Sequence, residues 1–315
     1  MPISLTSDAL EATITPERGA DIVQVIDLAT GTPLFAESPT GLVRAGEGFA
    51  TDSMAGWLRG YPGGWQLLVP NAGPERDHDG VRQGFHGEAA LAAWTVLAQD
   101  AASCELETYL LTAPLRLRRS VSVSGDTLTI TDEIENLSPD PVETRIVQHP
   151  AFGAPFLDGE SYVITSAAKI VTDADAPGSL ATADVIARPD EMLEAGPEPG
   201  SIRLPGPRAG TSLFAALTEF TIPEVTFCSP TRGLSVRLAW DSAILPHAWL
   251  WIEANAGSGW PWFRRLYAIA VEPANVLPGE GGTPEHPRGG TGTHIPAGQS
   301  ITLTTSLTRL ELSRD

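Results

Sequence analysis

The chain has a single lysine and two cysteines, and this scarcity excludes several kinds of chemistry. Lys169 is the only lysine among 315 residues. A Walker-type phosphate loop needs a lysine after its second glycine, and the stretch "DAPGSL" downstream of Lys169 has neither the order nor the spacing. Schiff-base catalysis would have to use Lys169 itself. Cys104 and Cys228 stand in no metal or redox motif, so we expect reduced, packed thiols.

Basic residues and long apolar segments are also scarce. The chain carries 39 acidic and 20 basic side chains, a formal net charge of −19. This charge repels phosphate backbones and anionic lipid, so we predict neither a nucleic acid nor a membrane as partner. A neutral or cationic small molecule fits better. No segment approaches the ~20 apolar residues of a membrane span, and no signal peptide is recognisable. We predict a soluble, cytoplasmic protein that is a monomer or a homodimer.

Long helical patterns are missing too, and the periodicity is that of strands. The stretch "LRLRRSVSVSGDTLTITDEIEN" alternates apolar and polar residues on both sides of Ser124-Gly125-Asp126, which predicts a hairpin with one solvated face. Similar alternation occurs in "GLSVRLAWD" and "SITLTTSLTRLEL". The 31 glycines and 27 prolines separate short strands. We predict an all-β sandwich or barrel in one domain, residues 1–315, with long surface loops at 172–201 and 278–299.

Polar residues interrupt the strand patterns beside glycine or proline in four segments. These are "GGWQLLVPNAG", "VRQGFHGEA", "RIVQHPAFGAPF" and "GSGWPWFRRLYAIAVEP". Each residue taken alone has a structural explanation, as a turn asparagine, a solvated strand end or a core aromatic. The segments supply six candidate site residues, which are Asn71, Arg82, His86, His149, Trp262 and Glu272.

The order and spacing of these segments resemble those of the aldose 1-epimerase (galactose mutarotase) family. The stretch "ITPERGADIVQVID" is similar to the opening strand pair of that family, and "GGWQLLVPNAG" and "GFHGEAALAAW" to its asparagine and first histidine segments. "QHPAFGAPF" is similar to its second histidine segment, and "GWPWFRRLYAIAVEP" to the strand that ends in its base. The chain resembles a divergent subgroup of the family.

The resemblance implies a fold, a reaction and roles for the candidate residues. The fold is a large antiparallel β-supersandwich, and the reaction interconverts the α and β anomers of a free sugar without a cofactor or metal. Glu272 would be the base at the anomeric hydroxyl, His149 the acid at the ring oxygen, and His86 would orient the sugar near that oxygen. We expect the neighbouring carboxylate to keep the acid histidine protonated. Asn71, Arg82 and Trp262 would hold the sugar.

The chain departs from the family pattern at three points. The second histidine segment commonly has an aromatic residue and an asparagine after the histidine, and here it reads Pro150-Ala151-Phe152-Gly153. Ala72 and Gly73 follow Asn71 where family members carry a nearby arginine, so Arg82 takes that role by inference. The aspartate that contacts a sugar hydroxyl in the family has no position that we can align, and Asp184 and Asp241 are guesses.

Three other functions remain open from the sequence. The first is a non-catalytic carbohydrate-binding or regulatory protein on the same fold. The second is a glycosidase, which needs a second carboxylate beside Glu272, and Glu88 and Glu253 are the options. The third is a sugar-phosphate epimerase, which needs clustered basic residues, whereas the arginines of "RLRR" alternate as on a solvated strand face.

Overall fold

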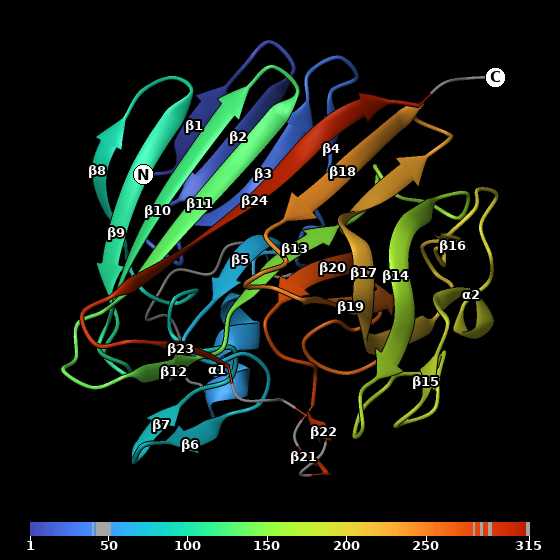
Figure 1. Ribbon diagram of the computed structural model, residues 1–315. Coiled ribbons are helices and arrows are strands. Elements are labelled where there is room, and N and C mark those ends of the chain that lie inside the picture. Colours follow the sequence, from blue (N-terminus) through green and yellow to red (C-terminus); the bar gives the residue numbers. More distant parts are fainter. Residues whose placement is uncertain (40, 42–51, 280, 284–285, 289–291, 313–315) are drawn as a thin grey trace.

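The computed structural model describes residues 1–39, 41, 52–279, 281–283, 286–288 and 292–312. Nearly all the secondary structure of this part of the chain is antiparallel strand, and most strands belong to one sheet that folds over into two layers (Figure 1). The all-β fold is therefore as predicted. The first layer contains β8 (Thr95–Gln99), β9 (Ser103–Tyr109), β10 (Leu115–Ser124), β11 (Thr127–Asn136), β24 (Ser300–Glu311) and β18 (Leu234–Trp240).

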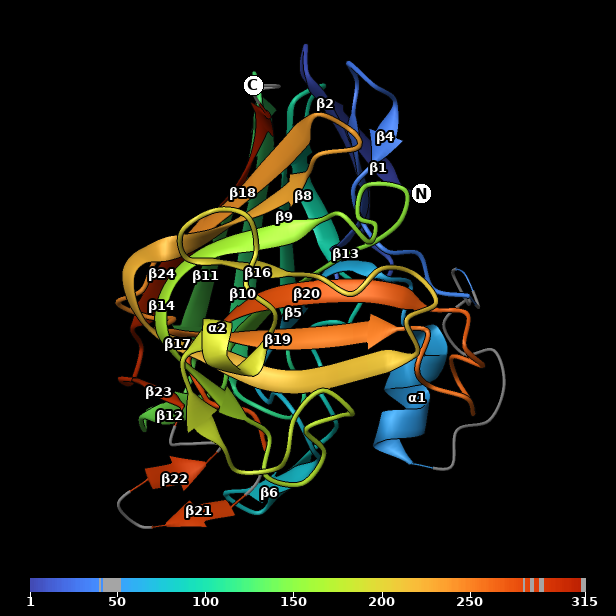
Figure 2. The same ribbon diagram turned by 90° about the vertical axis from the view of Figure 1, so that its right-hand side faces the viewer.

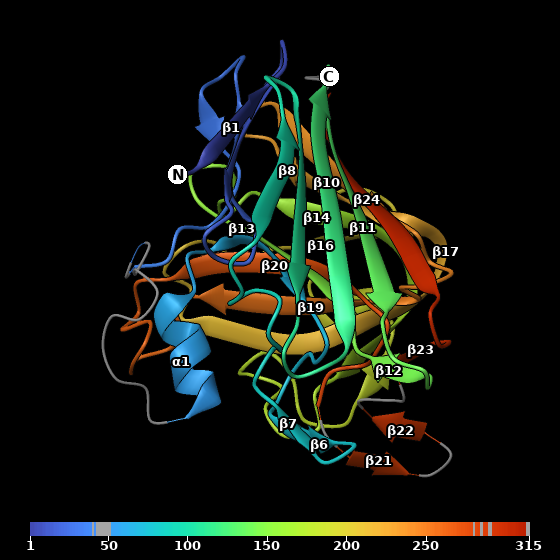
Figure 3. The same ribbon diagram turned by 90° about the vertical axis from the view of Figure 1, so that its left-hand side faces the viewer.

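The second layer runs across the first, as Figure 3 shows with the first layer in front. Its strands are β1 (Ile3–Thr6), β2 (Leu10–Thr15), β3 (Asp21–Asp27), β5 (Gly64–Leu68), β13 (Val147–Phe152), β20 (Tyr267–Ala274), β19 (His247–Ala254), β17 (Thr211–Ser229) and β14 (Tyr162–Thr172). Three short strands belong to the same sheet: β4 (Thr32–Pro33), β15 (Ile186–Ala187) and β16 (Ser201–Arg203). Separate two-stranded sheets pair β6 (Arg76–His78) with β7 (Val81–Gln83), β12 (Val142–Thr144) with β23 (Thr293–Ile295), and β21 (Gly281–Thr283) with β22 (His286–Arg288).

The long strand β17 carries the sheet from one layer to the other. Its first half pairs with β19 and its second half with β18, while β14 pairs along both halves. Glu219, with a φ of 58°, and Pro223 lie between the two halves. A left-handed residue and a proline both interrupt regular pairing, so the strand bends where it changes partner.

Burial along the strands explains why the two layers have different sequence patterns. β10 and β11 alternate buried with partly or fully exposed residues and form the predicted hairpin, with Ser124 opposite Thr127 across the turn. Every residue of β5, β13 and β20 is buried. These three adjacent strands are covered on both faces, so a polar side chain on them has little access to bulk water.

Two helices occur in the described part of the chain, and one of them positions the site. α1 (Ser53–Gly60) begins at Asp52, whose carboxylate accepts a hydrogen bond from the amide of Ala55 at 2.7 Å. This is an ordinary N-cap. α2 (Pro189–Met192) and β15 lie in the segment predicted as a surface loop, residues 172–201, so that segment is more structured than expected. Figure 2 shows α1 beside the ends of β17 and β19.

Candidate active site

A cavity of about 360 Å³ opens over the second layer, between the sheet and α1. Aromatic rings form most of its wall: Trp57, Phe85, Phe214, Trp249, Trp251 and Trp262. Its polar lining residues are His86, His149, Asp173, Asp175 and Glu272. Small-molecule sites commonly combine such an apolar wall with a few convergent polar groups.

Glu272 and His149 face each other at the base of this cavity. The β13–β20 register places them side by side, and Nε2 of His149 lies 3.5 Å from Oε1 of Glu272. Glu272 is 1% exposed and His149 is 5% exposed. Neither carboxylate oxygen of Glu272 accepts a hydrogen bond from any described residue. A buried carboxyl group beside a histidine can exchange protons with a ligand that enters the cavity.

His86 reaches the same cavity from the loop that follows β7. Its backbone has a φ of 59°, and its ring lies 5.9 Å from that of His149 and 4.6 Å from that of Trp57. Nδ1 of His86 accepts a hydrogen bond of 3.0 Å from the amide of Gly73, so the ring proton of the neutral imidazole is on Nε2. The next residue, Gly87, has a φ of 73°, and a Cβ there would lie 2.6 Å from the carbonyl oxygen of Val69. The turn that presents His86 therefore requires glycine.

Burial determines the charge state of the three groups. It raises the pKa of Glu272 well above its ordinary value, lowers the pKa of His149 to about 4, and lowers that of His86 well below its ordinary value. Loss of solvation outweighs the attraction between the pair. In the free protein, burial therefore favours the neutral forms of both Glu272 and His149, which opposes the expected protonation of His149 by the carboxylate.

The other three candidate residues lie in different surroundings. Trp262 lines the cavity, with its ring 5.8 Å from that of Tyr61. Asn71 is buried outside the cavity lining, and its amide donates to the carbonyls of Pro74 and Gly84, so it closes the loop that carries His86. Arg82 is on β7 with 66% of its side chain exposed and is paired with Glu75.

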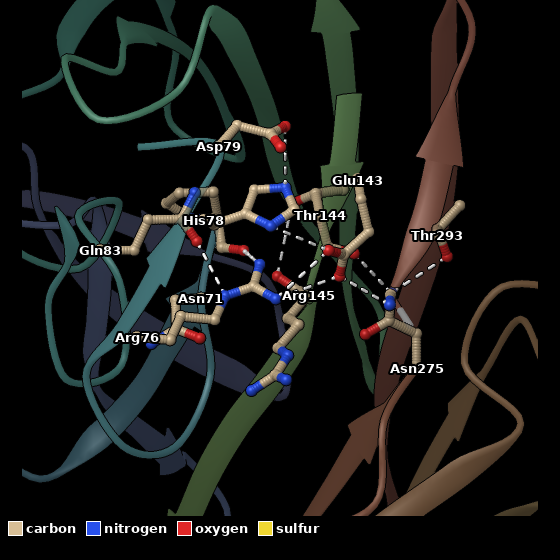
Figure 4. A network of polar contacts seen from close by, with 12 residues as sticks. Asn71, Arg76, His78, Asp79, Gln83, Glu143, Thr144, Arg145, Asn275 and Thr293 are labelled. Atoms are coloured by element: carbon tan, nitrogen blue, oxygen red, sulfur yellow. Dashed lines mark hydrogen bonds and ion pairs between the residues drawn. The ribbon is translucent and has the colours of Figure 1, made fainter. Parts of the chain in front are cut away.

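The prediction that Arg82 contacts the ligand is thus not met, because the alternation of the β6–β7 hairpin turns it toward solvent. The less exposed arginine of this hairpin is Arg76, which lies 3.2 Å from Glu143 (Figure 4). Glu143 also lies 3.3 Å from His78 and accepts a hydrogen bond from the amide of Gly292. This network anchors the hairpin to β12, so Arg76 has a structural partner and is not free to bind a ligand.

Sequence reasoning missed part of the cavity wall. Asp173 and Asp175 follow the buried last residues of β14, and acidic residues directly after an apolar strand end are the available signal in the sequence. Oδ1 of Asp173 accepts hydrogen bonds from the amides of Asp175 and Ala176. Trp57 lies on α1, which is too short to have a recognisable helical pattern in the sequence. Asp184 and Asp241 do not line the cavity.

The comparisons with solved structures define the class of the fold. The Slr1438 protein from Synechocystis superposes with a TM-score of 0.72 at 17% identity, covering 99% of this chain and 96% of that one. A putative aldose 1-epimerase from Escherichia coli K12 gives 0.71 at 16% identity, covering 99% of both chains. A galactose mutarotase related enzyme from Lactobacillus acidophilus gives 0.66 at 16% identity, covering 100% and 99%. The fold is that of the galactose mutarotase-like proteins.

A sequence model of a protein family also matches the chain. The model described as "Domain of unknown function (DUF4432)" matches residues 3–308, and the chain belongs to this family. The search of curated proteins found no match.

Proposed function

We propose that the protein is an isomerase of the aldose 1-epimerase kind, which interconverts the anomers of a free sugar. The observation that carries this proposal is the Glu272–His149 pair, buried and 3.5 Å apart in a cavity lined by aromatic rings. Opening a cyclic hemiacetal needs a base at the anomeric hydroxyl and an acid at the ring oxygen at the same time. A pair that holds one proton between two groups supplies both.

The proposed sequence of proton transfers begins when sugar hydroxyls replace water around the pair. The proton of Glu272 passes to His149, which gives a carboxylate and an imidazolium held together by their attraction. Glu272 then takes the proton of the anomeric hydroxyl while His149 protonates the ring oxygen. The bond between the anomeric carbon and the ring oxygen breaks, and an open-chain aldehyde forms. After rotation about the C1–C2 bond, the same transfers in reverse close the ring on the other face.

Two further residues have supporting roles in this proposal. The Nε2 proton of His86 donates to the substrate near the ring oxygen, where negative charge develops before protonation. The indole of Trp262 packs against the C–H face of the sugar. We propose that residues 1–315 act as one domain, because the cavity draws its lining from segments between Trp57 and Gly279.

The charges of the cavity favour a particular substrate class. Three lining residues carry carboxyl groups, the two lining histidines are neutral at pH 7, and none of the described lining residues is arginine or lysine. A phosphate or carboxylate group would be repelled and would lack a cationic partner. We therefore propose an uncharged or cationic sugar and not a sugar phosphate.

Anomer exchange measured by NMR at about pH 7 tests the proposal on a panel of free aldoses, an amino sugar, a sugar phosphate and a methyl glycoside. We expect the wild type to accelerate exchange of at least one uncharged or cationic sugar. Glu272→Gln should lower the rate by roughly 10²–10⁴-fold, the usual contribution of an acid–base group, while sugar binding persists.

Glu253→Gln is the matched control. Glu253 is a buried carboxylate on the adjacent strand β19, outside the cavity lining, and its Oε1 accepts hydrogen bonds from the amides of Ala256 and Gly257. Glutamine keeps that acceptor, so exchange should continue. Sugar binding without any accelerated exchange would instead identify a sugar-recognition protein. Hydrolysis of the methyl glycoside would identify a glycosidase.

A further inference from the structure

A row of polar side chains extends from the cavity across four adjacent strands. Glu272 on β20 lies beside His149 on β13, and His149 lies opposite Gln66 on β5. Continuing the β3–β5 register by one residue places Asp21 of β3 opposite Gln66. Cross-strand neighbours share a face of the sheet at a spacing of about 5 Å. Asp21 is therefore the far end of a row that begins at the proposed catalytic pair.

The polar atoms of this row are buried without conventional partners. Asp21 is 0% exposed and Gln66 is 1% exposed. Among the described residues, no hydrogen bond of normal geometry reaches either carboxylate oxygen of Asp21, Oε1 of Gln66 or Nδ1 of His149. Buried polar groups are rarely left unpaired, so a row of such atoms beside a candidate catalytic pair is an unusual feature of the core.

Tyr61, which follows the last residue of α1, packs against the middle of the row. Its ring lies 5.8 Å from that of His149 and stacks on Trp57 at 4.9 Å. Its hydroxyl is buried and has no hydrogen-bond partner among the described residues. Burial raises the pKa of Tyr61, and ionisation of Glu272 or Asp21 raises it further. The hydroxyl is thus protonated, with one proton to donate, and lies within electrostatic range of both carboxyl groups.

Burial and two nearby arginines have opposite effects on the pKa of Asp21. Arg18 approaches it from the same loop, and a Cβ on Gly60 would lie 1.7 Å from Nη1 of that arginine, so Arg18 packs tightly on the end of α1. Arg119 approaches from β10, but its guanidinium is already paired with Asp132. Burial raises the pKa of Asp21 to about 7, against the opposing effects of Arg18, Arg119 and the nearby Gln66 amide.

We infer that Asp21 and Tyr61 are positioning residues that control where the proton of the Glu272–His149 pair resides. This inference rests on the proposed function of that pair. When Asp21 is neutral, the Tyr61 hydroxyl donates toward Glu272, directly or through a buried water, and favours the carboxylate that the reaction needs. When Asp21 is ionised, the hydroxyl turns toward Asp21, and the second negative charge keeps the proton on Glu272.

Exchange rates measured from pH 5 to pH 9 test this control. For the wild type, kcat/KM should fall by roughly tenfold as the pH rises through about 7, the effect of one pKa unit on Glu272. Asp21→Asn should remove this fall, and Tyr61→Phe, which keeps the packing, should weaken it. Asp27→Asn is the matched control, because Asp27 ends the same strand, is equally buried and is paired with Arg309 at 2.7 Å. A fall that persists in both Asp21→Asn and Tyr61→Phe overturns the inference.

A second measurement needs no substrate and separates this inference from the proposed function. The ¹³C carboxyl resonance of Glu272, assigned by its loss in Glu272→Gln, is titrated in the free protein. Asp21→Asn and Tyr61→Phe should each shift its midpoint by roughly half a unit to one unit, and Asp27→Asn should not. Shifted midpoints without exchange in any variant would refute the proposed reaction alone. Unchanged midpoints in both variants would refute the control by Asp21 and Tyr61.

Discussion

At the scale of single residues, desolvation dominates the chemistry of the site. His149 and Glu272 lie close enough for an ion pair, yet burial shifts the pKa of each toward its neutral form. A dry cavity is therefore part of the proposed mechanism, because the polar groups of the substrate, and not bulk water, solvate the charges that form.

The lowered pKa of His149 predicts how kcat/KM changes at acidic pH. A second proton on the neutral pair would leave His149 charged and Glu272 protonated, with no base. Because the folded-state pKa of His149 is lowered to about 4, we expect kcat/KM to hold from pH 6 to pH 5 and to fall with a midpoint near 4.

The contribution of His149 to folding stability also decreases as the pH falls. A depressed histidine pKa contributes stability that is fully present above its unfolded value, near 6.5, and is lost as the pH falls through about 4. Circular dichroism at each pH separates unfolding from loss of the base. A midpoint near 6.5 in folded protein would show that His149 is solvated, contrary to this account.

At the scale of elements, α1 is the part of the cavity wall that is least supported by the sheet. It brings Trp57 to the cavity, and Tyr61 follows it, while Oγ of Ser53 accepts a hydrogen bond from the amide of Phe85, next to His86. One short helix thus positions the cavity ring of Trp57, the Tyr61 ring that stacks on it, and the loop of the first histidine. An eight-residue helix is marginal by itself, so its cap and its packing decide whether it is formed.

Replacing the cap tests this dependence. Asp52→Ala removes the side-chain acceptor for the amide of Ala55 and should destabilise α1 by about 1 kcal/mol. We expect a several-fold higher KM with a smaller change in kcat, and faster hydrogen exchange confined to α1. Asp52→Asn retains a capping oxygen and should behave like the wild type. Equal exchange rates in α1 for both variants would show that the cap is dispensable.

At the scale of the whole molecule, the sheet holds both cysteines out of reach of solvent. Cys104 on β9 and Cys228 on β17 are unpaired and buried. Burial raises the pKa of Cys104 to about 11, so the reactive thiolate is scarce as well as inaccessible.

None of the described helices is long and apolar enough to cross a membrane.

Thiol reactivity therefore reports on the stability of the main sheet. We expect both cysteines to react with Ellman's reagent at least about 10³-fold more slowly in the native protein than in urea, since reaction requires opening of the sheet. Single Cys→Ala variants assign the two rates. One fast cysteine in native buffer would show that its strand opens locally.

Strand alternation determined the parts of the fold that are local in the chain. The β10–β11 hairpin has its turn where Ser124-Gly125-Asp126 indicated, because alternation and turn residues are encoded within about twenty positions. Sequence patterns also selected Glu272, His149, His86 and Trp262 as candidate site residues, and all four line the cavity. The sequence could not show that Asn71 binds backbone carbonyls or that Arg82 points to solvent, because side-chain direction depends on register and packing.

Only the tertiary structure decided which residues meet. Pairing of strands distant in the sequence places Asp21, Gln66, His149 and Glu272 in one row. Burial by both layers shifts the pKa values of the proposed catalytic pair toward the neutral forms, opposite to the charge states expected from the sequence. The physical reason is that register and desolvation are properties of the assembled sheet: a residue's neighbours in space, and the water they exclude, set its pKa and its chemistry.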